Sequence, residues 1–126
     1  GAENPNFGNY LGYVSDDELN NLYNSTQFLL LPSKAEGIGL PMIEAMICGA
    51  LPITCNDNET AKEFLPLDFI CAPNAGSILE CIKKLEQDYE IKRKLAFKFG
   101  TEYKEKFNKI TIAKNILNII KWYMFL

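Results

Sequence analysis

The feature that most constrains the fold is an alternation of short apolar runs with a helix-forming segment. Phe28–Leu31 and Leu51–Cys55 are continuous apolar runs. Between them, Leu40–Cys48 contains helix formers, with Pro41 in the first turn and Gly49 just past the end. Fully apolar runs of this length are typical of strands that are covered on both faces. The order therefore predicts an α/β fold in which helices pack on a parallel sheet.

The rest of the chain extends this pattern. A strand is expected over residues 7–14, followed by a helix with Ser15 as N-cap and Glu18 at the capping-box position. The run 28–31 is expected to be the central strand, because it is apolar throughout. Downstream we expect a short helix at residues 63–65, a strand at residues 69–71, and a helical end comprising residues 77–85, 89–107 (interrupted at Gly100) and 111–126.

Composition bounds both size and function. The 126 residues suffice for one domain, and 48% hydrophobic with 23% charged residues is typical of a packed fold. The net charge of −3 argues against nucleic-acid binding, which needs a basic excess. The chain has no histidine, and its four cysteines lack C-x-x-C spacing, so no metal site is expected. We expect reduced thiols, as in a cytosolic protein.

Residues 32–52 are the segment in which chemistry is expected. The loop after the first apolar run contains Gly37 and Gly39, which let the backbone approach a phosphate or a sugar closely. In open α/β sheets, ligands bind where such loops lead into helix N-termini. Glu36 lies in the loop and Glu44 inside the helix, so these carboxylates are expected to reach different parts of one ligand. The alternative is that the glycines only form a turn and the glutamates have structural or solvated positions.

The whole segment is more specific than its glycines. The sequence PSKAEGIGLPMIEAMICGALPI closely resembles the motif of retaining glycosyltransferases of family 4, also called group 1, in which two glutamates are separated by seven residues. Glu36 and Glu44 have this spacing. The sequences GYVSDDELNNLYNSTQFLLLPS and KFNKITIAKNILNII, together with Glu63-Phe64, resemble flanking parts of the same family.

This resemblance implies a Rossmann-like sheet with flanking helices, as in the carboxy-terminal, nucleotide-sugar-binding domain of a GT-B enzyme. It implies that Glu44 binds the donor ribose and that Glu36 is the catalytic-side residue at the donor sugar. Backbone N–H groups of Gly37, Ile38, Gly39 and Leu40 would contact the sugar and the diphosphate. The implied reaction transfers a sugar from a nucleoside diphosphate to an acceptor hydroxyl with retention, without a metal or another cofactor.

Departures from the family pattern limit what the chain is expected to do alone. It begins after the first βαβ portion, which carries a Gly-Arg…Lys pair for the diphosphate in relatives. Lys34 is the only cation of the loop, and it either contacts the phosphate or is a solvated lysine. In the loop after the next strand, Glu59-Thr60 stands where many relatives have a Gly-Gly pair. We interpret residues 1–126 as a partial donor-binding domain without its amino-terminal acceptor domain, and expect no transfer by this chain alone.

The expected partners are a nucleotide sugar and the acceptor domain of the same protein. The apolar end of the chain, with Trp122 and Tyr123, is predicted to drive self-association if that domain is missing. The lysine-rich stretch 92–109 is a solvated face or a contact with anionic lipid. The first residues are polar and the last apolar stretch is too short for a bilayer, which predicts a cytoplasmic protein, with the inner membrane face as a peripheral alternative.

Two other functions remain open at this level. One is a non-catalytic sugar-nucleotide-binding subunit that needs a partner chain. The other is an α/β interaction domain in which the two glutamates are structural. The role expected from the family is the synthesis of a cell-envelope glycan.

Overall fold

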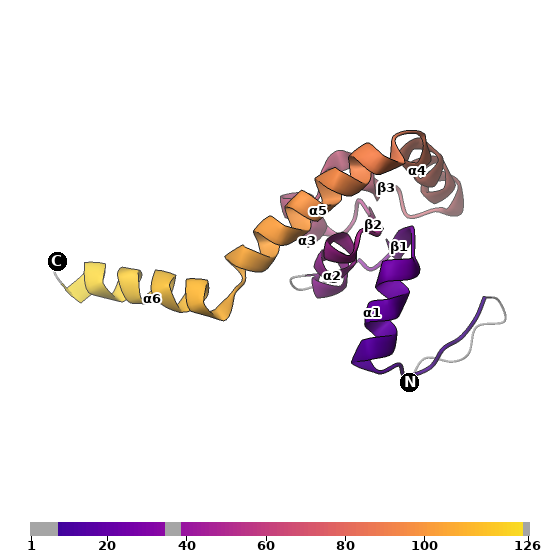
Figure 1. Cartoon of the computed structure of the whole chain (residues 1–126). Coiled ribbons are helices and arrows are strands. Elements are labelled where there is room, and N and C mark those ends of the chain that lie inside the picture. The colour runs from indigo at the N-terminus through magenta and orange to yellow at the C-terminus, as the bar shows by residue number, and fades with distance from the viewer. Residues whose placement is uncertain (1–7, 35–38, 125–126) are drawn as a thin grey trace.

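The strands form a parallel sheet. The computed structural model describes residues 8–34 and 39–124, and within them β1 (Phe28–Leu31), β2 (Leu51–Cys55) and β3 (Ile70–Cys71) lie side by side in that order. The parallel register pairs Phe28 with Leu51 and Thr54 with Ile70. Helices connect the strands and flank the sheet (Figure 1). The α/β class, with a Rossmann-like parallel sheet and a helical carboxy-terminal end, is confirmed.

β2, rather than β1, is the central strand. All residues of β2 are buried, whereas Leu30 of β1 is 48% exposed. Among the described residues, β1 pairs with β2 on one side and with no strand on the other. The prediction of a central strand at residues 28–31 is therefore wrong. An apolar run shows that a strand is partly covered, but not which strands flank it.

The prediction of a strand over residues 7–14 is also wrong for residues 8–14, the part that the structure describes. Residues 8–14 form neither helix nor strand. The φ angles of Gly8 and Gly12 are 72° and 65°, in the left-handed region, which interrupts an extended backbone. The aromatic and aliphatic residues of this segment consequently have no sheet to join.

α1 (Asp16–Ser25) has the predicted capping box. The Oγ of Ser15 accepts a hydrogen bond from the Glu18 amide at 3.3 Å, and the Glu18 carboxylate accepts one from the Ser15 amide at 2.8 Å. Two amides that a helix start leaves unpaired are thereby satisfied. The start of α1 is thus set by its own sequence.

α2 (Leu40–Cys48) is bounded by two left-handed glycines. Gly39 is the N-cap with φ 67°, and Gly49 is the C-cap with φ 91°. The Gly49 amide donates to the Met46 carbonyl at 3.1 Å, which closes the last turn. Met42 and Met46 are fully buried, so α2 contributes much of the core. The predicted helix is confirmed at both ends.

The next segment contains short elements. α3 (Glu59–Phe64) starts earlier than predicted, because Asn58 caps it by accepting a hydrogen bond from the Ala61 amide at 3.1 Å. A 3₁₀ turn, η1 (Leu67–Phe69), then leads into β3. Phe69 belongs to this turn and is fully buried. The predicted strand therefore begins one residue later than expected.

α4 (Ala75–Gln87) and α5 (Tyr89–Lys106) follow, and α5 is continuous through Gly100. The predicted interruption at Gly100 is wrong. A Cβ at this position would lie 2.9 Å from the Cβ of Met46 and 3.2 Å from the backbone nitrogen of Ile47. The glycine is therefore explained by the close approach of α5 to α2 rather than by a break in the helix.

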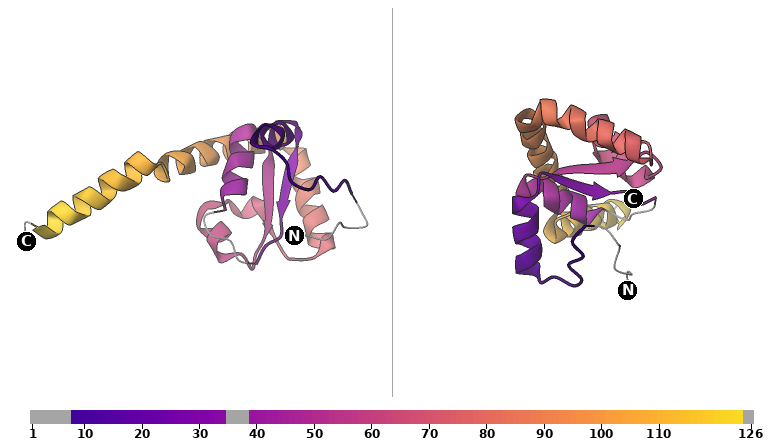
Figure 2. Two further views of the ribbon diagram at one scale, coloured as in Figure 1. Left: turned by 90° about the horizontal axis from the view of Figure 1, so that it is seen from below. Right: turned by 90° about the vertical axis from the view of Figure 1, so that its right-hand side faces the viewer.

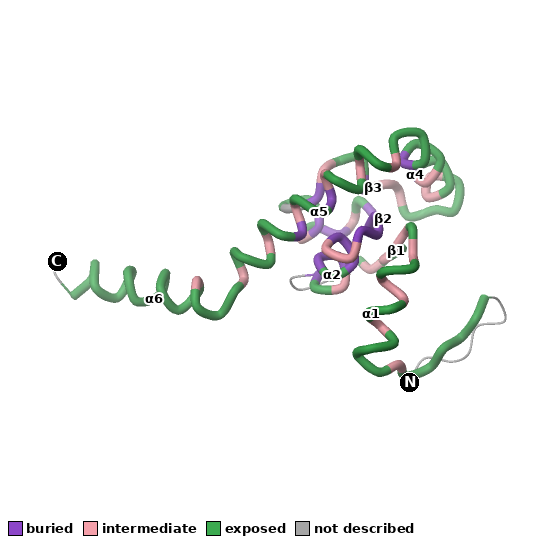
Figure 3. The backbone as a smooth tube through the Cα atoms, in the orientation of Figure 1, coloured by how far each residue is buried: buried purple, intermediate pink, exposed green. Residues whose placement is uncertain are grey.

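α6 (Lys109–Met124) extends away from the rest of the described chain (Figures 1 and 2). Apart from Thr111, all of its residues are exposed (Figure 3). They include Ile116, Leu117 and Ile120, which are 51%, 55% and 47% exposed. The core lies instead between the sheet and the inner faces of α2, α4 and α5.

Candidate functional site

A chain of buried polar groups fixes the end of β1, from which the predicted loop departs. The Asn58 amide group donates to Thr54 Oγ1 at 3.5 Å, and that hydroxyl donates to the Leu31 carbonyl at 2.8 Å. Asn58 and Thr54 are 0% and 1% exposed. Because buried hydrogen bonds are costly to break, β2 holds the last residue of β1 in place. The loop therefore starts from a fixed point.

The far end of the loop is equally constrained. Gly39 is buried, and its carbonyl accepts hydrogen bonds from the amides of Met42 at 2.9 Å and Ile43 at 3.4 Å. Among the described residues, no side chain caps the amides of the first turn of α2. Leu40 is 55% exposed at this helix start. The positive end of the helix dipole is thus directed at the loop side of the sheet.

The predicted site residues are only partly covered by the structure. Glu36, Gly37 and Ile38 lie outside the described residues. Lys34 is exposed after β1. Gly39, Leu40 and Glu44 are described, and Leu40 and Glu44 line the same pocket.

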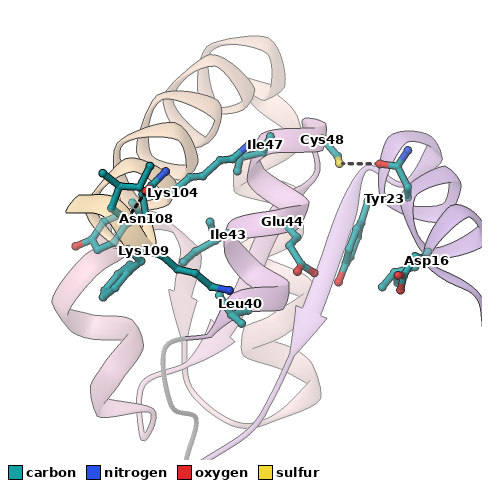
Figure 4. A pocket seen from close by; sticks show the side chains of 15 residues that line it. Asp16, Tyr23, Leu40, Ile43, Glu44, Ile47, Cys48, Lys104, Asn108 and Lys109 are labelled. Atoms are coloured by element: carbon teal, nitrogen blue, oxygen red, sulfur yellow. Dashed lines mark hydrogen bonds between the residues drawn. The ribbon is translucent and has the colours of Figure 1, made fainter. Parts of the chain in front are cut away.

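This pocket has a volume of about 910 Å³ and lies between α1, α2, the end of α5 and the start of α6. Figure 4 shows the side chains around it. The Cys48 thiol of α2 donates to Asn20 Oδ1 of α1 at 3.8 Å, which joins the two helices at one end of the pocket. A cavity of this size is in the usual range for small-molecule sites.

Glu44 and Tyr23 face one another across the junction of α2 and α1 (Figure 4). Glu44 is exposed, whereas Tyr23 is half-buried. Burial and, after it, the charge of the Glu44 carboxylate raise the pKa of Tyr23 above its usual value. An exposed carboxylate beside a neutral phenol is suited to accept hydrogen bonds from ligand hydroxyls.

Sequence reasoning missed the opposite wall of the pocket. It includes Tyr103 and Lys104 of α5, the C-cap residue Phe107 that follows this helix, and Lys109 of α6. The two aromatic rings stack with centroids 5.9 Å apart. Their four-residue spacing on one helix was the available signal, since such residues share a face. Two lysines of the stretch interpreted as a solvated face or a lipid contact thus line a cavity that also contains Glu44.

Asp57 is another residue that sequence reasoning missed. It follows β2, at the sheet edge where the loop after β1 also begins. Its Oδ1 is buried and has no hydrogen-bond partner among the described residues. Nothing in the spacing of the loop after β2 distinguished this carboxylate from its polar neighbours.

Comparison with known proteins identifies the family. The model for glycosyl transferases group 1 matches residues 2–116. The chain belongs to the group 1 glycosyltransferases. The match includes the loop, α2 with Glu44, and the helices that surround the pocket.

Relatives of this group 1 glycosyltransferase chain include bacterial and archaeal proteins. It is 48% identical over 54 residues to an O-antigen chain mannosyltransferase B of Escherichia coli, covering 43% of the chain and 14% of the relative. It is 45% identical over 47 residues to a serotype-specific mannosyltransferase WbdA of Escherichia coli, covering 37% and 6%. An uncharacterized glycosyltransferase of Methanocaldococcus jannaschii is 25% identical over 116 residues, covering 89% and 30%. The group 1 chain thus spans a minor part of each relative.

The described residues of this group 1 chain contain no group of three or more histidine, cysteine or acidic side chains placed to hold a metal ion. None of their helices is both long enough and apolar enough to cross a membrane. All four cysteines are free thiols. Burial raises the pKa values of Cys55, Cys71 and Cys81, which makes them poor nucleophiles at neutral pH.

Proposed function

We propose that this chain is the nucleotide-sugar-binding part of a retaining, family 4 glycosyltransferase. It would bind a nucleoside-diphosphate sugar whose sugar is then transferred to an acceptor hydroxyl. The observation that carries the proposal is the group 1 match over residues 2–116, which spans α2 and its exposed Glu44. The pocket beside Glu44 supports it, because a carboxylate at a cavity wall can accept hydrogen bonds from both hydroxyls of a ribose.

Each candidate residue has a role in this proposal. Glu44 accepts hydrogen bonds from the ribose, and Glu36 acts at the donor sugar. The backbone amides of residues 37–40 contact the sugar and the diphosphate, where the start of α2 favours negative charge. Lys34 adds a positive charge to the same loop. The left-handed, buried Gly39 supports this arrangement, because it lets the chain turn sharply into α2.

The chemistry follows from where charge develops. When the bond between the sugar and the diphosphate breaks, negative charge grows on the leaving phosphate oxygen. Amides and a helix dipole that already point there stabilise this charge without reorganising. Retention is proposed on the family 4 resemblance of the two-glutamate segment, and the reaction is proposed to need no metal or other cofactor.

The sugar and the product are proposed from the relatives. Two of them carry mannosyltransferase names, and one of these names specifies an O-antigen chain. We therefore propose a mannose donor and a cell-envelope glycan as the product. Synthesis would take place in the cytoplasm. The alternative is that the protein binds peripherally to the inner face of the membrane.

Residues 1–126 are proposed to form a partial donor-binding domain. Its matches cover only 14%, 6% and 30% of the three relatives described above. The amino-terminal acceptor domain of the same protein is the proposed partner, and transfer requires it. The exposed apolar side chains of α6 are the proposed contact surface. Large apolar patches on a protein surface commonly mark the place where a partner binds. Without that domain, α6 would drive self-association.

Calorimetric titration of the chain with UDP, GDP and ADP tests the donor site. One diphosphate should bind specifically, and Glu44→Gln should weaken it about tenfold or more, because hydrogen bonds to a charged acceptor are lost. Glu86→Gln on the exposed face of α4 removes the same charge away from the pocket and should change nothing. Equal affinities of wild type and Glu44→Gln would refute the role of Glu44.

Light scattering over a range of concentrations tests the surface of α6. The wild-type chain should grow in mean mass with concentration, and an Ile116→Asp/Ile120→Asp double variant should remain monomeric. A Lys114→Asp variant introduces the same aspartate into α6, by reversing a charge, without removing an apolar group. A wild-type chain that is monomeric at high concentration counts against self-association.

A further inference from the structure

Tyr23 and Glu44 lie next to each other in the pocket but differ in how far their surroundings restrict them. Tyr23 projects from α1 and is half-buried, while Glu44 projects from α2 into the pocket and is exposed. Figure 4 shows the carboxylate of Glu44 and the hydroxyl of Tyr23 directed toward one another. A glutamate side chain has more rotatable bonds than a tyrosine and loses more entropy when a ligand fixes it. A partner that fixes the carboxylate beforehand reduces this cost.

The position of Tyr23 is itself well determined. α1 is stabilised at its start by the capping box of Ser15 and Glu18, and in its middle Asn20 Oδ1 accepts a hydrogen bond from the Cys48 thiol of α2. The first contact keeps α1 helical, and the second ties the helix that carries Tyr23 to α2. A tyrosine hydroxyl has one proton to donate, and an ionised carboxylate has about four lone-pair positions. Tyr23 therefore occupies only part of the accepting capacity of Glu44.

We propose that Tyr23 is a positioning residue that orients the Glu44 carboxylate toward the ribose hydroxyls of the donor. Its hydroxyl donates to one carboxylate oxygen, and the remaining lone pairs accept from the ribose. This inference rests on the proposed function, because it concerns the same nucleotide site. It adds a residue from α1, outside the two-glutamate segment, to the determinants of ribose recognition.

The electrostatics of the pocket agree with this role. Burial and, after it, the charge of the neighbouring Glu44 carboxylate raise the pKa of Tyr23, so the phenol retains its proton at neutral pH. A neutral phenol donates to the carboxylate, whereas a phenolate would repel it. Asp16 of α1 and Lys109 of α6 line the same pocket, and neither replaces the phenol as a half-buried donor.

The test compares ribose recognition rather than affinity alone. Wild type, Tyr23→Phe, Glu44→Gln and the double variant are titrated with GDP and 2′-deoxy-GDP, and with the matching uridine and adenosine pairs. Wild type should prefer the ribonucleotide. Tyr23→Phe should reduce this preference about fivefold, the effect of one hydrogen bond. A structural defect would instead weaken both forms equally.

The double variant and a control separate positioning from a general change. Because Tyr23 acts through Glu44, adding Tyr23→Phe to Glu44→Gln should cause no further loss. Tyr123→Phe on the exposed α6 removes the same hydroxyl away from the pocket and should retain the wild-type preference. Thermal unfolding of all variants shows that each is folded.

The outcomes distinguish this inference from the function on which it rests. A wild-type preference for ribose that Tyr23→Phe leaves unchanged overturns the positioning role alone. Additive losses in the double variant overturn it as well. A wild-type chain that binds none of the diphosphates, or that shows no preference for ribose, overturns the proposed donor site and this inference with it.

Discussion

Gly100 of α5 lies directly against Met46 of α2, so that a Cβ on the glycine would be 2.9 Å from the Cβ of the methionine. Real Cβ atoms essentially never approach each other so closely. The backbone nitrogen of Ile47, the next residue of α2, would lie 3.2 Å from the same Cβ. The contact between α5 and α2 therefore depends on the absence of a side chain at residue 100.

Gly100→Ala should destabilise the chain by about 1–2 kcal/mol, because overpacking outweighs the gain in helix propensity. Urea unfolding measures this loss. Gly76→Ala is the matched control, since Gly76 lies in α4 and a Cβ there would meet only Asn74 Oδ1, at 3.4 Å. The control should be neutral or slightly stabilising. An equally stable Gly100→Ala variant would contradict the close contact.

Asn58→Ala should cost about 2–3 kcal/mol, more than the loss of an ordinary N-cap. The buried side chain caps α3 and also donates to Thr54, whose hydroxyl holds the end of β1. Asn74 of α4 caps in the same way, by accepting from the Ser77 amide at 2.9 Å, but it is exposed. Asn74→Ala should therefore cost only about 1 kcal/mol. Similar losses in chemical denaturation of both variants would show that the buried network contributes little.

The capping box predicts a pH dependence at acid pH. Hydrogen bonds from the Ser15 amide and hydroxyl lower the pKa of Glu18. A carboxyl whose pKa is lowered by folding stabilises the folded state above its unfolded pKa, and this contribution is lost as pH falls through the folded pKa. NMR titration of Ser15→Ala should give a higher pKa for Glu18 than in wild type, but only part of the shift should be lost, because the amide of residue 15 still donates to the carboxylate. Ser25→Ala at the other end of α1 should leave this pKa unchanged, and an unchanged pKa of Glu18 in Ser15→Ala would refute the contribution of the Ser15 hydroxyl.

The buried thiols predict a loss of stability at alkaline pH. Burial raises the pKa values of Cys55, Cys71 and Cys81, so each thiol ionises more readily in the unfolded chain. Stability from such groups is present below the unfolded pKa and declines as pH rises above it. The urea midpoint should fall between about pH 8 and 10, less steeply for Cys81→Ala than for wild type. Identical slopes would exclude Cys81 as a contributor.

Local signals in the sequence were sufficient for most helices and strands. Ser15 with Glu18 defines the start of α1, and Pro41 with Gly49 bounds α2, because caps and left-handed glycines act within one turn. Gly100 shows the limit of this reasoning. A glycine within a helical pattern can mark a break or a close packing contact, and only the position of α2 distinguishes these.

The candidate site divides in the same way. Glu44 and Leu40 could be assigned from one segment, since the loop and the helix that follow β1 are local. Tyr23 and Lys109 could not, because their part in the pocket depends on how α1 and α6 are placed beside α2. The binding and catalytic roles assigned to the site residues all stay predictions, including those of Glu44, Leu40 and Gly39, and Glu36, Gly37 and Ile38 also lie outside the described residues.

The pocket is lined by residues from Asp16 to Ile110, almost the full span of the described chain. During synthesis the chain leaves the ribosome from its amino terminus, so α1 and α2 are made well before the wall formed by α5 and α6. A ligand that touches both walls cannot stabilise a partly made chain. Nascent chains would therefore bind the nucleotide only after synthesis has passed Ile110. Protection of the chain from proteolysis by the ligand would appear late, and in a single step.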